Sequence, residues 1–294
     1  MINLLVLYDI DGYAYWRRAQ ALSKYAADDF AVMIAPWQRV IDSGLDVNQF
    51  DIVFSLDFAL RRRFGAVPHV MSFNADSHRR KEWWDSCLAS CDFLICNNRE
   101  VFDFHRRQER TCNISNGLDT EIFRCVRPID ARIERVFWTG SPTIAKGKGW
   151  DLLQAAKQKM IAKGFIPDFH PVTSVSNQPF DTEQIVRKYN DSSYVVCMSS
   201  SEGTPGTSLE GMACGACLVT TRVGNALEFP QSPENCILID RSVDGLIDGL
   251  LRAREKRVEI ATAGMRLMHD HWSYGEPGRR ADKFYWLFRE LVAG

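Results

Sequence analysis

The stretch Tyr194–Thr221, YVVCMSSSEGTPGTSLEGMACGACLVTT, decides the fold that this chain can adopt. Its two apolar runs, Tyr194–Met198 and Cys217–Thr221, are typical of strands that are buried on both faces. Between them, a turn rich in Gly, Ser and Thr leads into a helical pattern that begins near Leu209. A strand, a helix and a second strand in this order form the unit from which parallel α/β folds are built.

The same alternation of short apolar runs and helical patterns extends along the chain in both directions. The polar segment Val126–Arg135 lacks periodicity, so we interpret it as a linker between two α/β domains, residues 1–125 and 126–277. A final amphipathic helix is expected at 278–292. The other expected strands are Ile2–Tyr8, Ala31–Ala35, Ile52–Ser55, His69–Ser72, Phe93–Cys96, Cys112–Ile114, Val136–Trp138, Asp168–Pro171 and Cys236–Ile239.

The composition is that of an ordinary globular protein, with 46% hydrophobic and 25% charged residues over 294 positions. The 36 Lys and Arg residues nearly balance the 37 Asp and Glu residues, and the net charge of −1 excludes a polyelectrolyte. No apolar stretch reaches the length of about 18 residues that a transmembrane helix needs. The nine cysteines are odd in number and lie in apolar settings, which is typical of reduced thiols and predicts a cytoplasmic protein.

Two glutamates with seven residues between them, Glu202 and Glu210, flank the turn. Thr207 and Ser208 can cap the following helix, and the N–H groups at a helix start suit the oxygens of a diphosphate. A carboxylate in the first helical turn repels an anion unless it points aside, so the two glutamates suit sugar and ribose hydroxyls better than phosphate. A capped helix with solvated glutamates is the alternative interpretation.

The string SEGTPGTSLEGMACGACLVTTRVGNALE (Ser201–Glu228) resembles the donor-site signature of retaining GT-B glycosyltransferases of family 4, also called group 1. ISNGLDTEIF (Ile114–Phe123) and FWTGSPTIAKGKGWDLLQAA (Phe137–Ala156) resemble two further segments of that family, in the family's order. The resemblance covers most of residues 92–230. It implies a GT-B fold, in which two Rossmann-like domains face each other across a cleft and the C-terminal helix returns to the N-terminal domain.

The resemblance also implies an activity, the transfer of a hexose from a nucleotide sugar to an acceptor hydroxyl with retention of configuration, in polysaccharide or glycolipid biosynthesis. It implies that Glu210 binds the ribose, that Glu202 contacts the donor sugar, and that Lys148 or Lys146 neutralises the phosphates. Backbone groups at the helix start would line the diphosphate. The implied donor site consists of Gly12, Gly140, Ser141, Lys146, Lys148, Glu202, Gly203, Gly206, Thr207, Ser208, Leu209 and Glu210.

The N-terminal domain matches this family less well, because the family's histidine has no clear counterpart in VPHVMSFNADSHRR. Asn74 and Asp76 stand nearest its place, and they join Glu202 and Lys148 as catalytic candidates. The family's usual arginine after the strand-end glycine is replaced by Ser141. The resemblance implies neither a metal nor a cofactor, and the donor would be a UDP-, GDP- or ADP-sugar.

Basic residues gather between positions 61 and 110, where ten of them stand against seven acidic ones. Arg79, Arg80 and Lys81 lie beside Trp83 and Trp84, a pattern that fits peripheral contact with the inner face of a membrane and a glycolipid acceptor. The same stretch fits a glycan, a phosphorylated sugar or a nucleic acid, although the near-zero net charge gives no support to the last. A solvated helix face with its tryptophans in the core is a further interpretation.

Two other functions fit parts of the sequence. Asp9 and Asp11 follow an apolar run and resemble the first motif of haloacid-dehalogenase-type phosphatases, with Asp240 and Asp244 as a second acidic motif for Mg²⁺. That hypothesis leaves the two spaced glutamates unexplained. The other alternative is a catalytically silent subunit that binds a nucleotide sugar, and the substitution at Ser141 favours it.

Overall fold

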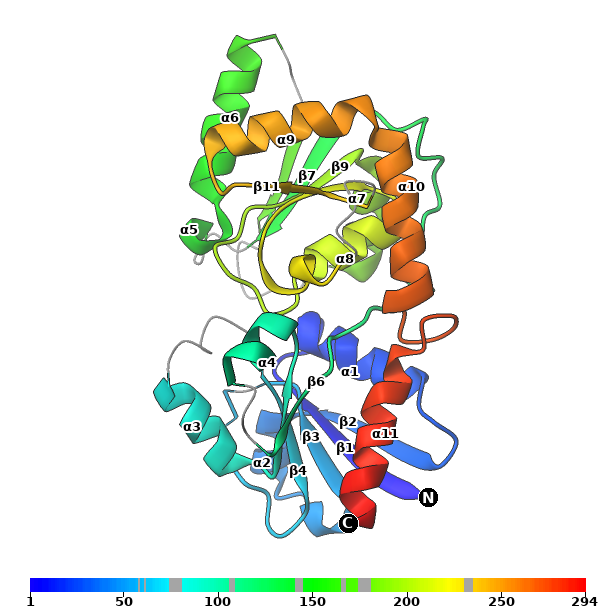
Figure 1. The fold of residues 1–294 in the computed structure, drawn as a ribbon. Coiled ribbons are helices and arrows are strands. Elements are labelled where there is room, and N and C mark those ends of the chain that lie inside the picture. Colours follow the sequence, from blue (N-terminus) through cyan, green and yellow to red (C-terminus); the bar gives the residue numbers. More distant parts are fainter. Residues whose placement is uncertain are drawn as a thin grey trace. The chain divides into compact units, whose positions relative to one another are not determined.

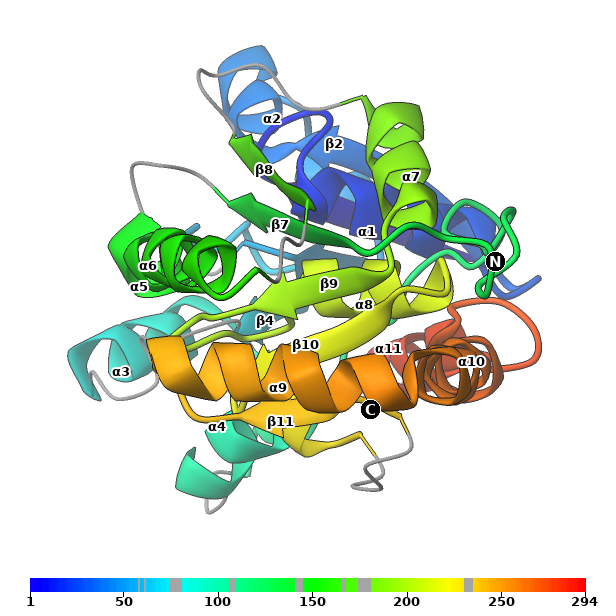
Figure 2. The same cartoon turned by 90° about the horizontal axis from the view of Figure 1, so that it is seen from above.

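The computed structural model describes residues 1–57, 59–60, 62–73, 81–105, 109–140, 145–164, 168–173, 181–229 and 235–294. The chain divides into two compact units, unit 1 with Met1–Gly117 and Tyr274–Gly294, and unit 2 with Leu118–Ser273. It therefore passes from one unit to the other twice. Figures 1 and 2 show that each unit is a sheet flanked by helices.

Unit 1 contains a parallel sheet and the helices that cover it. The strands are β1 (Ile2–Tyr8), β2 (Phe30–Pro36), β3 (Ile52–Ser55), β4 (His69–Phe73), β5 (Phe93–Cys96) and β6 (Thr111–Asn113), in the order β2-β1-β3-β4-β5-β6. The helices are α1 (Ala14–Lys24), α2 (Trp37–Ser43), α3 (Lys81–Ser90), α4 (Arg99–His105) and α11 (Arg280–Ala293), with a 3₁₀ turn at Val47–Gln49.

Alternation along β1 explains how the sheet of unit 1 is buried on both faces. Leu4 and Val6 pack with α1 and α11, whereas Leu5 and Leu7 pack with α2 on the opposite face. Since successive side chains of a strand point to opposite faces, an uninterrupted apolar run is needed for a sheet that is covered twice. This requirement accounts for the apolar run Ile2–Tyr8, and the strand predicted there is confirmed.

The last helix belongs to unit 1, as expected for 278–292. Its aromatic side chains pack on the sheet, with ring centroids of Phe30 and Tyr285 4.7 Å apart and those of Phe54 and Phe288 5.2 Å apart. The Tyr285 hydroxyl donates a hydrogen bond to the carbonyl oxygen of Leu22, at 2.6 Å. These contacts fix α11 across α1 and the sheet of unit 1.

Unit 2 repeats the same architecture with a second parallel sheet. The strands are β7 (Arg135–Gly140), β8 (Asp168–Thr173), β9 (Tyr194–Cys197), β10 (Cys217–Thr221) and β11 (Ile237–Ile239), in the order β11-β10-β9-β7-β8. The helices are α5 (Ala145–Lys148), α6 (Trp150–Ala162), α7 (Thr182–Asp191), α8 (Gly206–Ala213), α9 (Val243–Glu255) and α10 (Arg257–Leu267), with a 3₁₀ turn at Gly224–Leu227 and a π-helix at Met268–Trp272.

The two faces of this second sheet are covered by different helices (Figure 1). Tyr194 and Val196 pack with α6 and α9, whereas Val195 between them packs with α7 and α8. Gly211 of α8 allows that helix to approach β9 closely, because a Cβ at Gly211 would lie 2.7 Å from Cγ1 of Val195. The strand–helix–strand unit predicted from Tyr194–Thr221 is thus confirmed, with α8 packed on the two strands that it connects.

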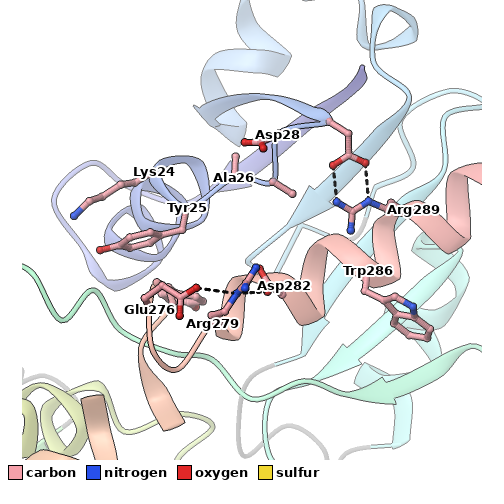
Figure 3. A pocket seen from close by; sticks show the side chains of 13 residues that line it. Lys24, Tyr25, Ala26, Asp28, Glu276, Arg279, Asp282, Trp286 and Arg289 are labelled. Carbon is pink, nitrogen blue, oxygen red and sulfur yellow. Dashed lines mark hydrogen bonds and ion pairs between the residues drawn. The ribbon is translucent and has the colours of Figure 1, made fainter. Parts of the chain in front are cut away.

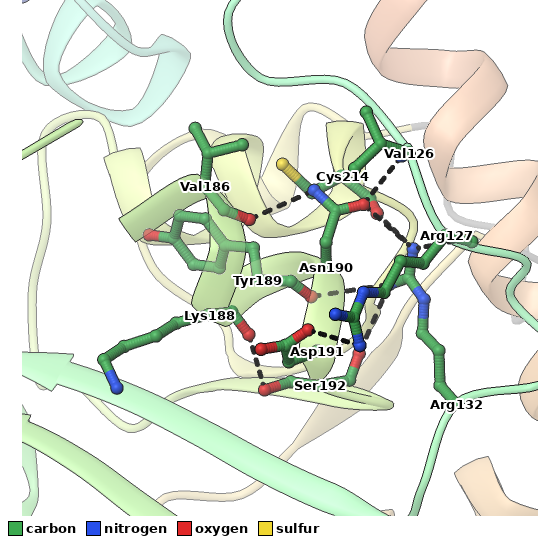
Figure 4. Close-up of polar contacts among 10 residues, drawn as sticks. All are labelled: Val126, Arg127, Arg132, Val186, Lys188, Tyr189, Asn190, Asp191, Ser192 and Cys214. Atoms are coloured by element: carbon green, nitrogen blue, oxygen red, sulfur yellow. Dashed lines mark hydrogen bonds and ion pairs between the residues drawn. The ribbon is translucent and has the colours of Figure 1, made fainter. Parts of the chain in front are cut away.

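The chain first passes from unit 1 to unit 2 between Gly117 and Leu118, whereas the sequence placed the division at 125 with a linker at Val126–Arg135. Arg132 shows why this polar segment belongs to unit 2 (Figure 4). Its side chain is buried, and it donates to the carbonyl oxygens of Cys214 at 2.6 Å and Ser192 at 3.3 Å. These carbonyls lie at the ends of α8 and α7, where helices leave acceptors without intrahelical partners. The buried guanidinium of Arg132 donates to these acceptors. The polar character of Val126–Arg135 therefore did not mean that the segment is a solvated linker.

All nine cysteines fall within the described residues, and none forms a disulfide. Seven of them are buried, and burial raises the pKa of the Cys217 thiol to about 12. Among the described residues, no helix is both long enough and apolar enough to cross a membrane.

Candidate functional site

Lys148 ends α5 and stands between two glycines that fix its backbone. The carbonyl oxygen of Gly147 accepts hydrogen bonds from the backbone N–H of Ser200 at 2.9 Å and from its hydroxyl at 3.3 Å. Gly149 has a φ of +76°, and a Cβ there would lie 2.6 Å from both Cβ and O of Met198. A side chain at this position is therefore excluded twice, by conformation and by space. The α5–α6 turn is held against the residues that follow β9.

Glu202 lies in the loop after β9 and pairs with Lys148. The Lys148 ammonium donates a hydrogen bond to Oε1 of Glu202, and the Ser199 hydroxyl donates to the same oxygen at 2.6 Å. The side chains of Lys148 and Glu202 are 29% and 15% exposed, so the charges are partly shielded from water. Partial burial strengthens their attraction relative to a surface pair.

The neighbouring strand β10 holds the loop that carries Glu202. Oγ1 of Thr221, at the end of β10, donates to the carbonyl oxygen of Ser199 at 2.7 Å. Gly224 has a φ of +51°, and a Cβ there would lie 2.8 Å from the carbonyl oxygen of Glu202 and against that of Gly203. The main chain of the loop is therefore contacted from two sides, by the hydroxyl of Thr221 and by the backbone of Gly224, which preorganises the glutamate.

Helix α8 starts earlier than the sequence suggested. It begins at Gly206 with Pro205 as its N-cap and no side-chain cap, so the expected caps Thr207 and Ser208 lie inside the first turn. The prediction of a start near Leu209 was wrong, because Gly206 does not break the helix at its first position. The N–H groups of Ser208 and Leu209 donate to the carbonyl oxygen of Pro205.

This start changes which groups of α8 can meet a ligand. Ser208 and Leu209 are buried, so their side chains face the core of unit 2. Gly206 and Thr207 are partly exposed, and their N–H groups precede any intrahelical acceptor. Together with the helix dipole, they give the N-terminus of α8 the character of an anion site.

Glu210 lies in the second turn of α8, not in the first as expected. Its Oε2 accepts a hydrogen bond from the Tyr189 hydroxyl at 3.0 Å, and its Oε1 would lie 3.7 Å from a Cβ at Gly206. Tyr189 is fully buried, with its ring edge-on to Phe137 at a centroid distance of 5.1 Å. The buried phenol thus fixes the carboxylate beside the helix start. Sequence reasoning missed Tyr189, whose only signal was its place on the apolar face of α7.

Lys148, Glu202 and the start of α8 all follow the carboxyl ends of β7 and β9, which are neighbours in one parallel sheet. Parallel sheets bind ligands at this edge, because loops and helix N-termini converge there. Among the side chains that the structure describes, this edge offers the ammonium of Lys148 and two carboxylates held by hydroxyl donors, together with the N–H groups at the start of α8. Cations and N–H groups suit phosphate oxygens, and carboxylates suit sugar hydroxyls.

Arg241 also borders this edge, although the sequence analysis did not select it as a site residue. It follows β11, donates from Nε to the carbonyl oxygen of Met198 at 2.9 Å, and lies 3.5 Å from the carbonyl oxygen of Gly147. It therefore ties the β9 loop to the turn that carries Lys148. Arg222, the residue that directly follows β10, is exposed.

The remaining candidates are placed only in part. Asn74, Asp76 and Ser141 lie outside the described residues, and so does the side chain of Lys146, whose backbone belongs to α5. Gly140 ends β7, where a Cβ would lie 2.6 Å from the ring of Trp138. Gly12 lies in unit 1 with a φ of +81°, and it allows the turn after β1.

The acidic motifs of the phosphatase hypothesis lie in different sheets. Asp9 follows β1 of unit 1, whereas Asp240 follows β11 of unit 2. Asp11 accepts a hydrogen bond from the Tyr8 hydroxyl at 2.6 Å, and Asp244 pairs with the exposed Lys159 at 3.0 Å. No group of three or more metal-ligating side chains occurs in the described part of the chain. The two acidic motifs do not lie at the edge of one sheet, so the structure does not support the phosphatase hypothesis.

A buried Ser55–His69 contact resembles a nucleophile and its base but lies inside the sheet of unit 1. Ser55 Oγ is 2.9 Å from His69 Nε2, and His69 Nδ1 is 3.0 Å from the carbonyl oxygen of Ser90. Since a carbonyl can only accept, Nδ1 carries the proton and Nε2 accepts from the hydroxyl. Burial lowers the pKa of His69 to about 4, so the ring is neutral and structural at pH 7.

The basic stretch of unit 1 includes residues that are structural. Arg63 pairs with Asp92 at 2.8 Å and donates to the carbonyl oxygen of Cys91, which also accepts from Arg110. Trp84 is buried against Phe73 and is not available to a surface. Arg79 and Arg80 lie outside the described residues. For Trp84, the interpretation of a core tryptophan is correct.

The comparisons with known proteins agree with this architecture. A family model described as glycosyl transferase-like matches residues 135–283, which is half of the chain. Among curated proteins, none matches the sequence. Solved structures with similar folds include sucrose-phosphate synthase of Thermosynechococcus elongatus, with a TM-score of 0.73 and 14% identity over 100% of both chains. HepE of Anabaena has a TM-score of 0.72 and 13% identity, over 99% of this chain and 100% of HepE.

The catalytic domain of starch synthase IV of Arabidopsis thaliana has a TM-score of 0.72 and 10% identity, over 100% of this chain and 99% of that domain. These neighbours share the GT-B fold, in which each half is a parallel sheet between helices. The predicted fold class is therefore confirmed. Because the family model spans half of the chain, the chain belongs to the glycosyl transferase-like family.

Proposed function

We propose that this protein transfers a hexose from a nucleoside diphosphate sugar to an acceptor hydroxyl, with retention of the anomeric configuration and without a metal ion. The observation that carries the proposal is the ion pair of Lys148 with Glu202 at the sheet edge where α8 begins. HepE was solved with UDP and glucose, and starch synthase IV with ADP and acarbose. A nucleotide sugar is the donor that these precedents suggest for the present chain.

Each group has a role that follows from its chemistry. Lys148 and the N–H groups of Gly206 and Thr207 stabilise the charge that develops on the leaving diphosphate. Glu210, held by Tyr189, accepts hydrogen bonds from the ribose hydroxyls. Glu202 accepts hydrogen bonds from the donor sugar and keeps the ammonium of Lys148 in place. Lys148 and the helix dipole supply the charge that Mg²⁺ supplies in other transferases.

The proposed reaction breaks the bond between C1 of the hexose and the diphosphate oxygen. The acceptor oxygen forms a new bond to C1 on the same face, and its proton passes to the leaving phosphate oxygen. The nucleoside diphosphate departs as the second product. Because the leaving group accepts the proton, the protein's main contributions are positioning and charge stabilisation.

Donor turnover tests the proposal without knowledge of the acceptor, since water can replace it. The purified chain is incubated with UDP-, GDP- and ADP-glucose, with and without EDTA, and the released sugar is followed by ¹H NMR. We expect one donor to be cleaved at the same rate in EDTA, with the donor's anomer formed first. Release of the opposite anomer would contradict retention of configuration. Loss of cleavage in EDTA would contradict transfer without a metal ion. Nucleotide binding without any cleavage identifies the silent subunit instead.

A further inference from the structure

A cavity of about 780 Å³ lies in unit 1, which does not carry Lys148 and Glu202 (Figure 3). Its volume is within the range of about 300–1,000 Å³ that is usual for ligand sites. Three segments line it: the end of α1 with the loop to β2, the residues before α11, and one face of α11. The lining residues are Lys24, Tyr25, Ala26, Ala27, Asp28, Asp29, Tyr274, Gly275, Glu276, Arg279, Asp282, Trp286 and Arg289.

The wall of this cavity is fixed by close packing. A Cβ at Gly275 would lie 2.8 Å from Cδ1 of Tyr25, so the tyrosine ring rests directly on the glycine backbone. The ammonium of Lys24 lies 4.8 Å from the centre of the same ring. The hydrogen bond from Tyr285 to Leu22 joins α11 to α1, which both contribute to the cavity wall. The segments that line the cavity are therefore packed against each other before any ligand arrives.

Both arginines of the cavity are paired with carboxylates that line it. Arg289 donates from Nε and Nη2 to the two carboxylate oxygens of Asp29, at 2.6 and 2.5 Å. Arg279 pairs with Asp282 at 2.7 Å and with Glu276 at 3.3 Å. An anionic ligand would have to displace these carboxylates from their arginines. A hydroxyl-rich neutral ligand can instead bond to the remaining lone pairs and N–H groups without breaking either pair.

Trp286 adds an apolar plane to this polar wall. Trp286 is 61% exposed, although the neighbouring aromatic residues of α11, Tyr285 and Phe288, are buried in the core. The face of an indole is electron-rich and packs well on the polarised C–H groups of a sugar ring. The guanidinium and carboxylate groups of the cavity can bond to the hydroxyl groups of a sugar. The exposed indole of Trp286 can pack on the C–H face of the sugar ring.

We propose that this cavity binds a neutral oligosaccharide, as a glycan-binding site formed by unit 1 alone. The proposal goes beyond the transfer reaction, because it needs neither a nucleotide nor Lys148 and Glu202. In an enzyme that acts on glycans, such a site would hold the polymer on a region outside the donor-binding unit. Binding without nucleotide therefore tests it separately from the proposed transferase activity.

Isothermal titration calorimetry of the full chain without nucleotide provides the test, with maltoheptaose, cellohexaose and chitohexaose as neutral probes. A hyaluronan hexasaccharide serves as the anionic probe. The variants are Trp286→Ala and, as a matched control, Phe104→Ala, which removes an exposed aromatic residue of α4 in the same unit. Melting temperatures and size-exclusion profiles establish that each variant is folded and whether its oligomeric state changes.

We expect at least one neutral probe to bind with a Kd near or below about 1 mM, and Trp286→Ala to weaken it about tenfold. Phe104→Ala should bind like the wild type. The proposal is overturned if no neutral probe binds at about 10 mM, if folded Trp286→Ala binds unchanged, or if hyaluronan binds more tightly than every neutral probe. Self-association that disappears in Trp286→Ala would also overturn it, by assigning the indole to an interface between copies.

Discussion

Lys148 and Glu202 form an ion pair although they stand 54 positions apart in the sequence. Each is fixed by its own backbone, the lysine by Gly147 and Gly149 against the β9 loop, and the glutamate by contacts from Thr221 and Gly224. Because contacts to the main chain set both positions, neither side chain needs to search for its partner when a donor binds. Preorganisation of this kind is what charge stabilisation requires.

Removal of either partner should abolish transfer while the protein stays folded. We expect Lys148→Ala and Glu202→Ala each to lower donor turnover about 100-fold or more, because each removes a group that acts on the donor. Lys159→Ala, which breaks the exposed pair with Asp244, is the matched control. The measurement is nucleoside diphosphate release, with melting temperature as the check on folding. Turnover at the wild-type rate in either folded variant would refute the site.

The contact of Tyr189 with Glu210 should matter for nucleotide affinity. Tyr189→Phe removes one hydrogen bond but keeps the buried ring, so we expect the Kd for the nucleoside diphosphate to rise about threefold to tenfold. Glu210→Ala, which removes the carboxylate itself, should weaken binding further. Calorimetric titration measures both. If the wild type and Glu210→Ala bind the nucleotide with equal affinity, Glu210 does not bind the ribose.

Gly149 should tolerate no side chain. Gly149→Ala forces a Cβ against Met198 at a φ of +76°, and we expect a loss of about 2–4 kcal/mol in unfolding free energy together with loss of turnover. Gly164→Ala is the control, because its φ is +74° but no atom lies within 4 Å of the added Cβ. It should cost about 1 kcal/mol and leave turnover unchanged. Equal stability losses in urea unfolding would mean that the contact with Met198 is not limiting.

The buried His69 should make stability depend on pH. Its folded pKa of about 4 lies below the unfolded value of about 6.5, so between these values the unfolded chain takes up a proton that the folded chain does not. The unfolding free energy should therefore fall by about 2–4 kcal/mol as the pH decreases from about 7 to about 4.

Urea unfolding across this pH range, with two variants, isolates the histidine. His69→Gln should be less stable at pH 7 but show a smaller pH dependence than the wild type. Ser55→Ala keeps the buried imidazole and should keep the slope. An unchanged slope in His69→Gln would show that other groups cause the acid sensitivity.

The sequence predicted strands well where both faces of a sheet are covered. Ile2–Tyr8, Ile52–Ser55 and Phe93–Cys96 agree residue by residue with β1, β3 and β5, because a strand buried on both faces is apolar over most of its length. The start of α8 was less accurate, since Gly206 and Pro205 signal a turn and a helix start equally well. The sequence placed Arg132 in a linker, whereas it is buried in unit 2. A buried arginine that donates to carbonyl oxygens cannot be told from a solvated arginine by its sequence context.

The candidate site was predictable in its residue types but not in its supports. Glu202, Glu210 and Lys148 were selected by spacing and resemblance, and the structure brings Lys148 to Glu202. The groups that hold them, Tyr189 and Arg241, were not selected, because a tyrosine on an apolar face and an arginine after a strand are common. Long-range contacts of this kind depend on the strand order, which local sequence does not contain.

The most direct test of the central claim is a thermal-shift titration with UDP, GDP and ADP of the wild type, Lys148→Ala and Glu210→Ala. Selective binding of one nucleotide to the folded state raises the melting temperature as its concentration increases. We predict such a rise for one of the three nucleotides in the wild type, and its reduction in both variants. No response of the wild type to any of them, or the same response in all three proteins, would contradict the account.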